Sequence, residues 1–383
     1  MTTRGPLHIR HATIRDFRGI DVLDIDFPVG DAPDAGGVLV LGGDNGFGKT
    51  TVLEAMALGL GRGDLLPPDS AALAEQVRFG CRDFSIALTV ELDGNESRLE
   101  CTRAVLERPE ALIAEAPPAL HGLRIPLSAM GVAPRPNGPF WHTVREWAPR
   151  VAYLSARRDP ELLGAPTPAP SHRVVGMGSW ATGAEEAPRG IAALKKTLIS
   201  LYTRQRLQRA PAPDDRPDRF ERLQRFVRRF LGEDATVDVM FVDDSDRNGQ
   251  EVILRRGQLP SGVDTLADAR ARAVERGDVP VVLPIDRLSS GQLALFAFAE
   301  PLLFSENPPD VALIDEPERH LHVQWQRVIV SALHDLSPAT QLVVATHSLD
   351  LMQSVTSAEL AYLLPRSDPR RKANGAAEAE LPR

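Results

Sequence analysis

Residues 43–50 read Gly-Asp-Asn-Gly-Phe-Gly-Lys-Thr and match the phosphate-binding pattern G-x-x-x-x-G-K-[ST] at every fixed position. The apolar run 38–41 comes just before this loop and is typical of a strand buried on both faces. Residues 50–60 follow with helix-forming composition and apolar spacing. A strand, a glycine-rich loop and a helix in this order predict an α/β fold of the P-loop class.

The loop has the chemistry of a triphosphate site. Glycine lets the backbone bend around an anion, so that N–H groups and the positive end of the next helix face phosphate oxygens. Lys49 is expected to reach the β- and γ-phosphates, and the Thr50 hydroxyl to bind Mg²⁺. We therefore predict an ATP and Mg²⁺ site formed by Gly43, Asn45, Gly46, Gly48, Lys49, Thr50 and Thr51.

An acidic pair follows a second apolar run, residues 311–314. Ligands bind at the carboxyl ends of parallel strands, where this pair is expected to lie. Asp315 is predicted to hold Mg²⁺, directly or through water, and Glu316 to polarise the attacking water as general base. Taken alone, the pattern fits solvated carboxylates at a strand end equally well. Next to a complete phosphate loop it favours a hydrolytic site.

A third element, Leu-Ser-Ser-Gly-Gln at residues 288–292, precedes an apolar helical stretch. Ser289, Ser290, Gly291 and Gln292 would place hydroxyl and N–H donors at the positive end of that helix. Such donors form an anion site that has no lysine of its own. An ordinary serine N-cap is the alternative interpretation.

Taken together, these segments resemble the ABC-type ATPases, specifically the branch that contains SMC, RecF and OLD-nuclease proteins. The resemblance implies a P-loop NTPase fold with an ABC-type head, in which a mixed sheet is flanked by helices and carries a helical-hairpin insertion. In chain order, it is carried by the opening strand 14–20, the Walker A residues 45–50, the signature 288–292 with Ser290 in place of its first glycine, the Walker B and D-loop residues 315–322, and the switch segment 346–348.

The resemblance also implies an ATPase whose site is completed by homodimerisation on ATP. The signature of one subunit would close on the γ-phosphate held by Lys49 of the other. His347 would contact the γ-phosphate or the attacking water, while Glu318 and His320 would lie in the D-loop at the interface. Gln76 is a candidate for the Q-loop that senses Mg²⁺, although a surface glutamine is an equal alternative.

The sequence departs from the family at several points. Val323 stands where proline is frequent, and no long coiled coil separates the two halves. Only 33 residues follow Asp350, so the nuclease domain of OLD proteins is expected to be missing. Any nuclease activity is therefore expected from a separate effector partner.

Composition narrows the class of protein. The 383 residues include 44 basic and 52 acidic side chains, a net charge of −8, which argues against a nucleic-acid coat protein. Two cysteines, Cys81 and Cys101, cannot build a disulfide framework or a four-cysteine zinc site. No apolar run reaches 18 residues, so no membrane association is expected and the predicted location is cytoplasmic.

Charge is segregated within the chain. Between Arg189 and Arg229 there are 12 basic and four acidic residues, a local balance of +8. Helical patterns over 190–209 and 218–231, broken by prolines, predict a short helical hairpin in this insertion. The hairpin is expected to meet DNA, RNA or an acidic protein surface, or else to be a solvated charged face.

The motif order divides the chain into four parts. These are an N-terminal lobe (1–158), a loop with the basic insertion (159–235), a C-terminal lobe (236–365) and a disordered tail (366–383). Arg157 and Arg158 follow a predicted strand and are expected to face an anion or to be a solvated pair.

The favoured function is an ATP-driven switch in DNA-associated processes, either anti-phage defence or DNA repair. A transporter subunit is a second possibility, although Gly291 comes 248 positions after Gly43, a longer separation than expected for that class. A non-catalytic, ATP-sensing regulator of a toxin is the third.

Overall fold

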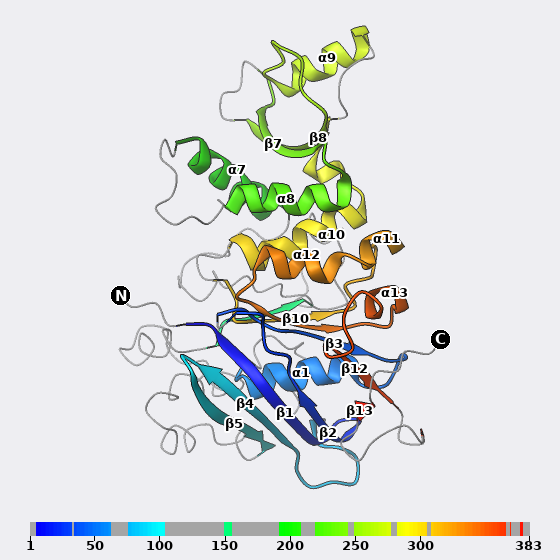
Figure 1. The fold of residues 1–383 in the computed structure, drawn as a ribbon. Helices are drawn as coiled ribbons and strands as arrows, with labels where there is room; N and C mark the ends of the chain where they lie inside the picture. The colour runs from blue at the N-terminus through cyan, green and yellow to red at the C-terminus, as the bar shows by residue number, and fades with distance from the viewer. Residues whose placement is uncertain are drawn as a thin grey trace. The chain divides into compact units, whose positions relative to one another are not determined.

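A computed structural model gives the fold (Figure 1). The structure describes residues 5–32, 34–62, 76–103, 149–154, 191–207, 219–243, 249–276, 282–304, 308–364, 368 and 376–377. The loop predicted for the first part of segment 159–235, residues 159–188, and the pair Arg157 and Arg158 lie outside the described residues. Two compact units are present, one with Met1–Arg158, Ala169–Gly183 and Asn307–Arg383, the other with Asp159–Pro168 and Ala184–Glu306.

The first unit contains a six-stranded sheet in the order β13-β12-β3-β11-β10-β6. All its strand pairs are parallel except the one between β12 and β13. Every residue of β3, β6, β10 and β11 is buried, as their continuous apolar sequences predict. The strands are β3 (Val38–Gly42), β6 (Val151–Leu154), β10 (Val311–Asp315), β11 (Gln341–Ala345), β12 (Leu360–Leu363) and β13 (Ala376–Ala377).

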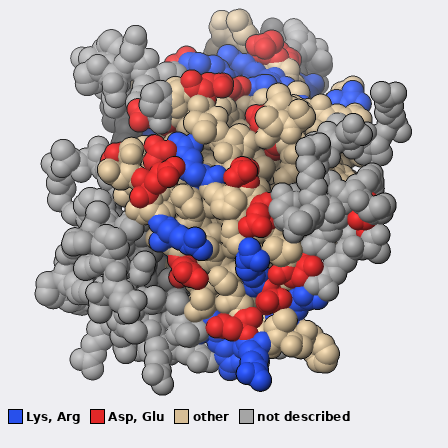
Figure 2. Space-filling model, turned by 60° about the horizontal axis from the view of Figure 1, so that its bottom comes forward, with Lys and Arg blue, Asp and Glu red and all other residues tan. Residues whose placement is uncertain are grey.

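A second, antiparallel sheet in this unit has the order β2-β1-β4-β5. The hairpin turn between β4 and β5 uses Asp93 and Gly94, both with positive φ, as an Asp-Gly pair predicts. Arg10 on β1 pairs with Glu91 on β4, and on the face that Figure 2 shows basic and acidic groups lie next to one another. The strands are β1 (Leu7–Phe17), β2 (Ile20–Asp26), β4 (Ser85–Leu92) and β5 (Asn95–Thr102).

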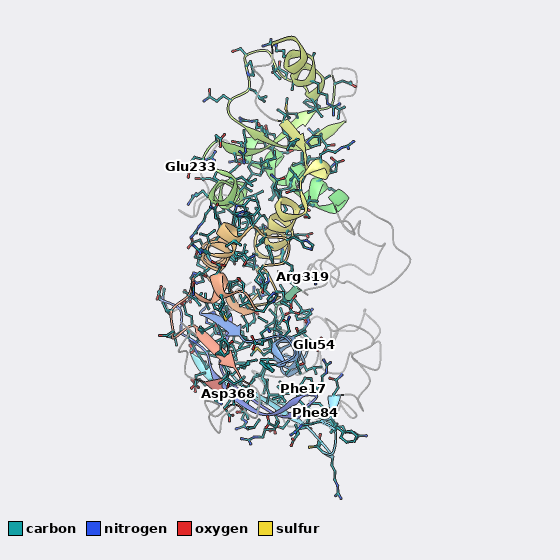
Figure 3. The ribbon with its side chains drawn as sticks, turned by 90° about the vertical axis from the view of Figure 1, so that its right-hand side faces the viewer. Phe17, Glu54, Phe84, Glu233, Arg319 and Asp368 are labelled. Atoms are coloured by element: carbon teal, nitrogen blue, oxygen red, sulfur yellow. The ribbon has the colours of Figure 1, made fainter. Side chains whose placement is uncertain are left out.

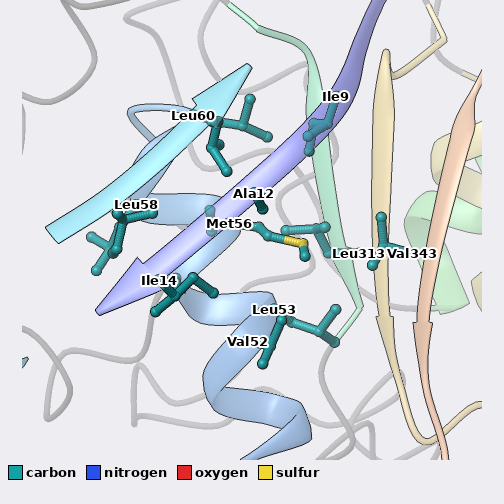
Figure 4. Packing of buried hydrophobic residues seen from close by; sticks show 14 of the residues in the cluster. Ile9, Ala12, Ile14, Val52, Leu53, Met56, Leu58, Leu60, Leu313 and Val343 are labelled. Carbon is teal, nitrogen blue, oxygen red and sulfur yellow. The ribbon is translucent and has the colours of Figure 1, made fainter. Parts of the chain in front are cut away.

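Helix α1 (Lys49–Gly59) lies between these two sheets and contacts strands of both. Nine of its residues are buried, because a helix covered on both sides must be apolar almost all round. Met56 and Leu53 occupy this interior together with Ile14 of β1 and Leu313 of β10 (Figure 4). The core therefore holds the helix that follows the phosphate loop firmly in place.

A buried polar contact also joins the two sheets, and an aromatic contact packs at the antiparallel sheet. The buried Gln341 side chain of β11 accepts a hydrogen bond from Ile9 N at 2.7 Å and donates one to Ile9 O at 2.8 Å. Phe17 and Phe84 stack edge to face, with ring centroids 5.3 Å apart (Figure 3). Short helices α11 (Val323–Gln326), α12 (Ile329–Leu336) and α13 (Leu349–Met352) complete the described part of this unit.

The second unit has helices where the sequence predicts a helical insertion. In α8, one face is basic and the other is apolar and buried. This unit continues to Glu306, so residues 236–306 group with the insertion, whereas the motif order placed them in the C-terminal lobe. Its elements are α7 (Ile191–Leu207), α8 (Arg219–Leu231), β7 (Ala235–Phe241), β8 (Gln250–Arg256), α9 (Leu266–Arg276), β9 (Val282–Pro284), η7 (Ile285–Arg287), α10 (Ser290–Ala299) and η8 (Glu300–Phe304).

Candidate functional site

The loop between β3 and α1 requires glycine at the motif positions. Gly43, Gly46 and Gly48 have φ values of 148°, 86° and 85°, which side chains other than hydrogen rarely tolerate. A Cβ at Gly43 would also lie 2.8 Å from the carbonyl oxygen of Leu363. The glycines of the motif therefore serve the loop conformation, as the pattern predicts.

Lys49 is buried at the first position of α1. Its ammonium donates hydrogen bonds to the carbonyl oxygens of Gly43 and Asp44, both at 2.8 Å. Burial lowers the pKa of Lys49, while the carboxylates of Glu316, Glu318, Asp315 and Asp44 act in the opposite direction. The ammonium thus sits inside the loop, where a phosphate oxygen would be a stronger acceptor than a carbonyl.

Strand order brings the distant motifs to one edge of the sheet. Strand β11 lies between β3 and β10, and all three are parallel (Figure 1). Their carboxyl ends therefore lie side by side, which is where such sheets bind ligands. These ends carry the phosphate loop, the pair Asp315 and Glu316, and the switch segment that contains His347.

The two predicted Mg²⁺ ligands contact each other. The Thr50 hydroxyl lies 2.9 Å from Oδ2 and 3.1 Å from Oδ1 of Asp315, and donates to this carboxylate. A hydroxyl and a carboxylate at the mouth of a phosphate loop are oxygen donors of the kind that Mg²⁺ prefers alongside phosphate oxygens and water. The residues therefore fit Mg²⁺.

Glu316 lies where its carboxylate can reach a ligand. Its backbone has a φ of 45°, and its N–H donates to Ala345 O at 2.8 Å. The carboxylate lies 3.8 Å from Nδ1 of His347 and 3.9 Å from Nε of Arg319, which Figure 3 labels. The side chains of Glu316 and His347 are 25% and 44% exposed, so both stay accessible from outside.

Gln76 is buried, so the interpretation as a surface glutamine is wrong. Its Oε1 accepts a hydrogen bond from Nε of Arg18 at 2.9 Å, and Arg18 also pairs with Glu54 on α1. The oxygen that would bind Mg²⁺ is thus committed to Arg18 in this structure. The role of Gln76 in sensing Mg²⁺ stays a prediction.

The signature residues belong to the second unit and begin α10. Ser289 is the N-cap: its hydroxyl accepts from Gln292 N at 3.3 Å, and Gln292 Oε1 accepts from Ser289 N at 2.9 Å. The N-cap interpretation is therefore confirmed for Ser289. Ser290 is exposed and Gly291 buried. The predicted contact with ATP on a second copy is a separate matter that stays a prediction.

Sequence reasoning missed one set of contacts at the site. The Glu318 side chain contacts Thr346 and His347 of the same unit. These two residues lie 28 and 29 positions after Glu318 in the chain, and only the pairing of β10 with β11 brings them to it. The pattern Asp-Glu-Pro-Glu contains the residue but gives no sign of its partner.

Two family models match the chain. One, described as "AAA domain", matches residues 12–103, which include the phosphate loop. The other, described as "AAA domain, putative AbiEii toxin, Type IV TA system", matches residues 163–353, which include the signature, Asp315, Glu316 and His347. The chain carries an AAA-type domain. The α/β P-loop fold expected from the motifs is confirmed by the parallel sheet and the helix that follows its phosphate loop, and the two matches bear out an AAA-type domain.

Relatives and solved structures are similar to this AAA-type chain over different lengths. The "Retron Vc95 probable ATPase" of Vibrio cholerae serotype O1 biovar El Tor is 33% identical over 92 residues, 21% of this chain and 18% of that protein. The chain thus spans less than a fifth of this curated relative. An SMC head bound to the C-winged helix domain of ScpA aligns with 14% identity, 94% coverage of each chain and a TM-score of 0.47.

Two further solved structures align over most of their lengths. The structure described as the recombination mediator protein RecF-ATPrS in the RecFOR pathway has 12% identity. The alignment covers 95% of this chain and 98% of that chain, with a TM-score of 0.41. The SMC head domain from Thermotoga maritima has 13% identity, 97% coverage of both chains and a TM-score of 0.41.

Among the helices that the structure describes, none has the length and apolar character needed to cross a bilayer.

Proposed function

We propose that this AAA-type chain binds Mg²⁺-ATP at the phosphate loop and hydrolyses it to ADP and phosphate. The observation that carries the proposal is the contact of Thr50 with Asp315 beside the buried Lys49. These three side chains come from two separate motifs and meet at the carboxyl edge of the parallel sheet. Each has the chemistry that a magnesium triphosphate requires at that place.

The chain's residues divide the work of hydrolysis. The loop N–H groups and Lys49 hold the β- and γ-phosphates and neutralise their charge. Glu316 accepts a proton from the attacking water. At the same time the water oxygen forms a bond to the γ-phosphorus, and the bond from that phosphorus to ADP breaks. His347 contacts the γ-phosphate or forms a hydrogen bond with that water. When bound, Mg²⁺ would be held by Thr50 and Asp315 and would neutralise charge on the β- and γ-phosphates.

Two copies of the chain complete the site in this proposal. Ser290, Gly291 and the N–H groups that begin α10 in one copy would close on the γ-phosphate held by the other. ATP would then favour the dimer, and hydrolysis would release it. The exposure of Ser290 supports this role, since its side chain is not used in the serine cap that Ser289 forms.

ATP binding and turnover by the purified chain test the proposal. The wild type should bind Mg²⁺-ATP and release phosphate, and Lys49→Ala should lose both, since the phosphates lose their ammonium partner. Lys196→Ala, which changes an exposed lysine of α7, is the matched control and should behave as wild type. Equal turnover in Lys49→Ala and wild type would refute an ATPase at this loop.

We further propose that the switch acts in anti-phage defence or DNA repair, in the cytoplasm, through a separate effector of the nuclease type. The match to a retron ATPase supports defence. Purification of the chain from its native cells, with and without the Glu316→Gln change, would test for a nuclease subunit that binds the closed state. An associated membrane-spanning subunit would instead favour a transporter.

The basic insertion is proposed to meet nucleic acid. On α8, Arg225 and Arg229 are exposed, but Arg225 pairs with Glu221, and on α7 Lys195 pairs with Glu251 and Asp286. These pairs use part of the local charge of +8 inside the unit. DNA binding should weaken with salt, with a slope of about −0.9 per phosphate neutralised. Arg225→Glu should reduce affinity, whereas Arg98→Glu on β5 should not.

A regulator of a toxin is the second candidate, and the family description that names the AbiEii toxin favours it. Nucleotide would then be sensed and hydrolysed slowly or not at all. Single-turnover hydrolysis by wild type and Glu316→Gln separates the two functions. Equal rates would favour the sensor, and a large difference would favour the ATPase.

A further inference from the structure

We propose that Glu318 is a positioning residue that orients the imidazole of His347 for ATP hydrolysis. The inference rests on the proposed ATPase function and deepens it, because it adds a residue that acts through His347. Sequence comparison with ABC-type ATPases suggests only a place for Glu318 in the D-loop. The contacts within this chain point to a different task.

One carboxylate oxygen of Glu318 accepts hydrogen bonds from the switch segment, residues 346–348. Oε1 accepts hydrogen bonds from the Thr346 hydroxyl at 2.6 Å and from His347 N at 2.9 Å. The ring atom Nδ1 of His347 lies 3.1 Å from the same oxygen. Glu316 is farther away, at 3.8 Å from Nδ1. Glu318 is therefore the carboxylate that contacts both the backbone and the ring of His347.

Burial makes this carboxylate costly to keep. The Glu318 side chain is 5% exposed, and its Oε2 is buried without a hydrogen-bond partner among the described residues. A buried carboxylate that is only partly satisfied destabilises a fold unless its donors compensate. Packing alone does not require a carboxylate at residue 318. This carboxylate lies beside the imidazole of His347, which the proposed mechanism uses.

The charge also selects the tautomer of His347. A carboxylate oxygen 3.1 Å from Nδ1 can accept a hydrogen bond only if Nδ1 carries a proton, so this contact favours a proton on Nδ1. In the neutral ring with its proton on Nδ1, Nε2 has a free electron pair, with which it can accept a hydrogen bond from the attacking water. A histidine held at one ring nitrogen by an acidic partner has a defined orientation at the other.

A second connection between the same two loops provides a matched control. Gln326 Oε1 accepts from the Ser348 hydroxyl at 2.6 Å, and Gln326 Nε2 donates to Leu321 O at 3.0 Å. This bridge joins the D-loop to the switch segment as Glu318 does. In the part of the chain that the structure describes, the Gln326 side chain makes no hydrogen bond to the imidazole, so its loss should disturb loop packing without changing the state of the ring.

The kinetic test compares Glu318→Ala, Glu318→Gln and Gln326→Ala with wild type. Glu318→Ala should lower kcat by roughly 10- to 100-fold, the range seen when the outer hydrogen-bond partner of a metal-ligating histidine is lost, while KM and ATP affinity stay near wild type. Glu318→Gln keeps an oxygen acceptor at the same place and should recover most of kcat. Gln326→Ala should keep kcat. A Glu318→Ala variant that lowers ATP affinity and keeps kcat would overturn the proposal.

A double-mutant cycle with His347→Ala shows whether Glu318 acts through the ring. If it does, adding Glu318→Ala to His347→Ala should cause no further loss of kcat. If the losses of kcat from the two single variants multiply in the double variant, Glu318 works independently of His347 and the proposal is wrong.

The ring itself provides a readout that needs neither ATP nor turnover. Nitrogen NMR of ¹⁵N-histidine-labelled, nucleotide-free protein should show a proton on Nδ1 of His347. The His347 signals would be assigned by their loss in His347→Ala. Glu318→Ala should lose this preference. A wild-type ring with a proton on Nε2 and none on Nδ1 would overturn the proposal, even if Glu318→Ala fails to fold. Absence of wild-type ATPase activity would instead refute the proposed function, and the tautomer would still test Glu318.

Discussion

The Thr50 hydroxyl donates to the carboxylate of Asp315 across 265 residues of sequence, with oxygen distances of 2.9 and 3.1 Å. Thr50 is the second residue of α1, and Asp315 is the last residue of β10. The contact places the end of the phosphate loop against an acidic strand end. It defines where a divalent cation would join a bound triphosphate.

Thr50→Val removes the hydroxyl and keeps the branched shape of the side chain. We expect the increase in ATP affinity that Mg²⁺ causes to be smaller by roughly 10-fold or more in this variant, because one metal ligand is lost. Titration of a fluorescent ATP analogue with Mg²⁺ and with EDTA would measure this. Thr50→Ser keeps the hydroxyl and should retain the Mg²⁺ effect. If both variants respond to Mg²⁺ like wild type, Thr50 is not a ligand.

Glu316→Gln separates binding from chemistry. The amide cannot accept the proton of the attacking water, so turnover should fall by roughly 100-fold or more, while the phosphate cradle and ATP affinity stay intact. Light scattering after size exclusion should then show a dimer with ATP and a monomer without it. An ATP-independent mass for Glu316→Gln would contradict the closure of two copies on nucleotide.

Ser290→Arg tests the signature while leaving the helix cap in place. Ser289 and Gln292 form the capping box, so α10 should keep its N-terminus in this variant. ATP affinity of the monomer should match wild type, but dimer formation and turnover should be lost, since a long charged side chain would block the approach to phosphate. Normal turnover in Ser290→Arg would rule out a signature that acts on a second copy.

Ser289→Ala is the structural counterpart of that variant. It removes the cap hydroxyl and should cost about 1 kcal/mol of stability. Thermal unfolding of the two variants side by side would show whether loss of turnover follows from loss of the helix end. Ser290→Arg should unfold close to wild type.

Cys101 should resist thiol reagents. Burial raises the pKa of Cys101 to about 12, and the negative charge of the Asp83 carboxylate contributes a smaller increase. The thiol is wholly buried on β5, whereas Cys81 is exposed. One thiol per folded chain should therefore react with an aromatic disulfide reagent, and Cys81→Ser should abolish this fast reaction. Two fast thiols would contradict the buried position of Cys101.

The raised pKa of Cys101 also has a consequence for stability. Below the unfolded pKa of 9.0 the thiol is protonated in both states, so it adds no pH dependence. Between that value and about 12, only the unfolded state loses its proton, so stability should fall by about 1.4 kcal/mol for each pH unit. Denaturant titrations of wild type and Cys101→Ala should show a shallower pH dependence in the variant.

Much of the fold and of the site followed from local sequence. Buried strands at β3, β10 and β11 are continuous apolar runs, and these are recognisable without tertiary information. The glycine pattern of the phosphate loop predicted its backbone, because Gly46 and Gly48 do adopt positive φ. The Asp-Gly turn of the β4–β5 hairpin followed in the same way.

Other features had no local signal. Short elements such as α11 and α13 lie in sequence that predicts neither helix nor strand. The grouping of residues 236–306 with the insertion also went unpredicted, since motif order says nothing about which segments pack together. Gln76 looked like a candidate ligand or a surface residue, and burial beside Arg18 excludes only the second interpretation.

The amino-acid sequence by itself determined the class of this protein, because phosphate binding depends on a short run of glycines, a lysine and a hydroxyl whose roles are set by covalent neighbours. Tertiary structure alone decided which groups meet across the sheet. Strand β11 lies between β3 and β10, and this order brings His347 to Glu318 and Thr50 to Asp315. Contacts between residues far apart in the chain depend on strand pairing, which no local pattern of residue types specifies.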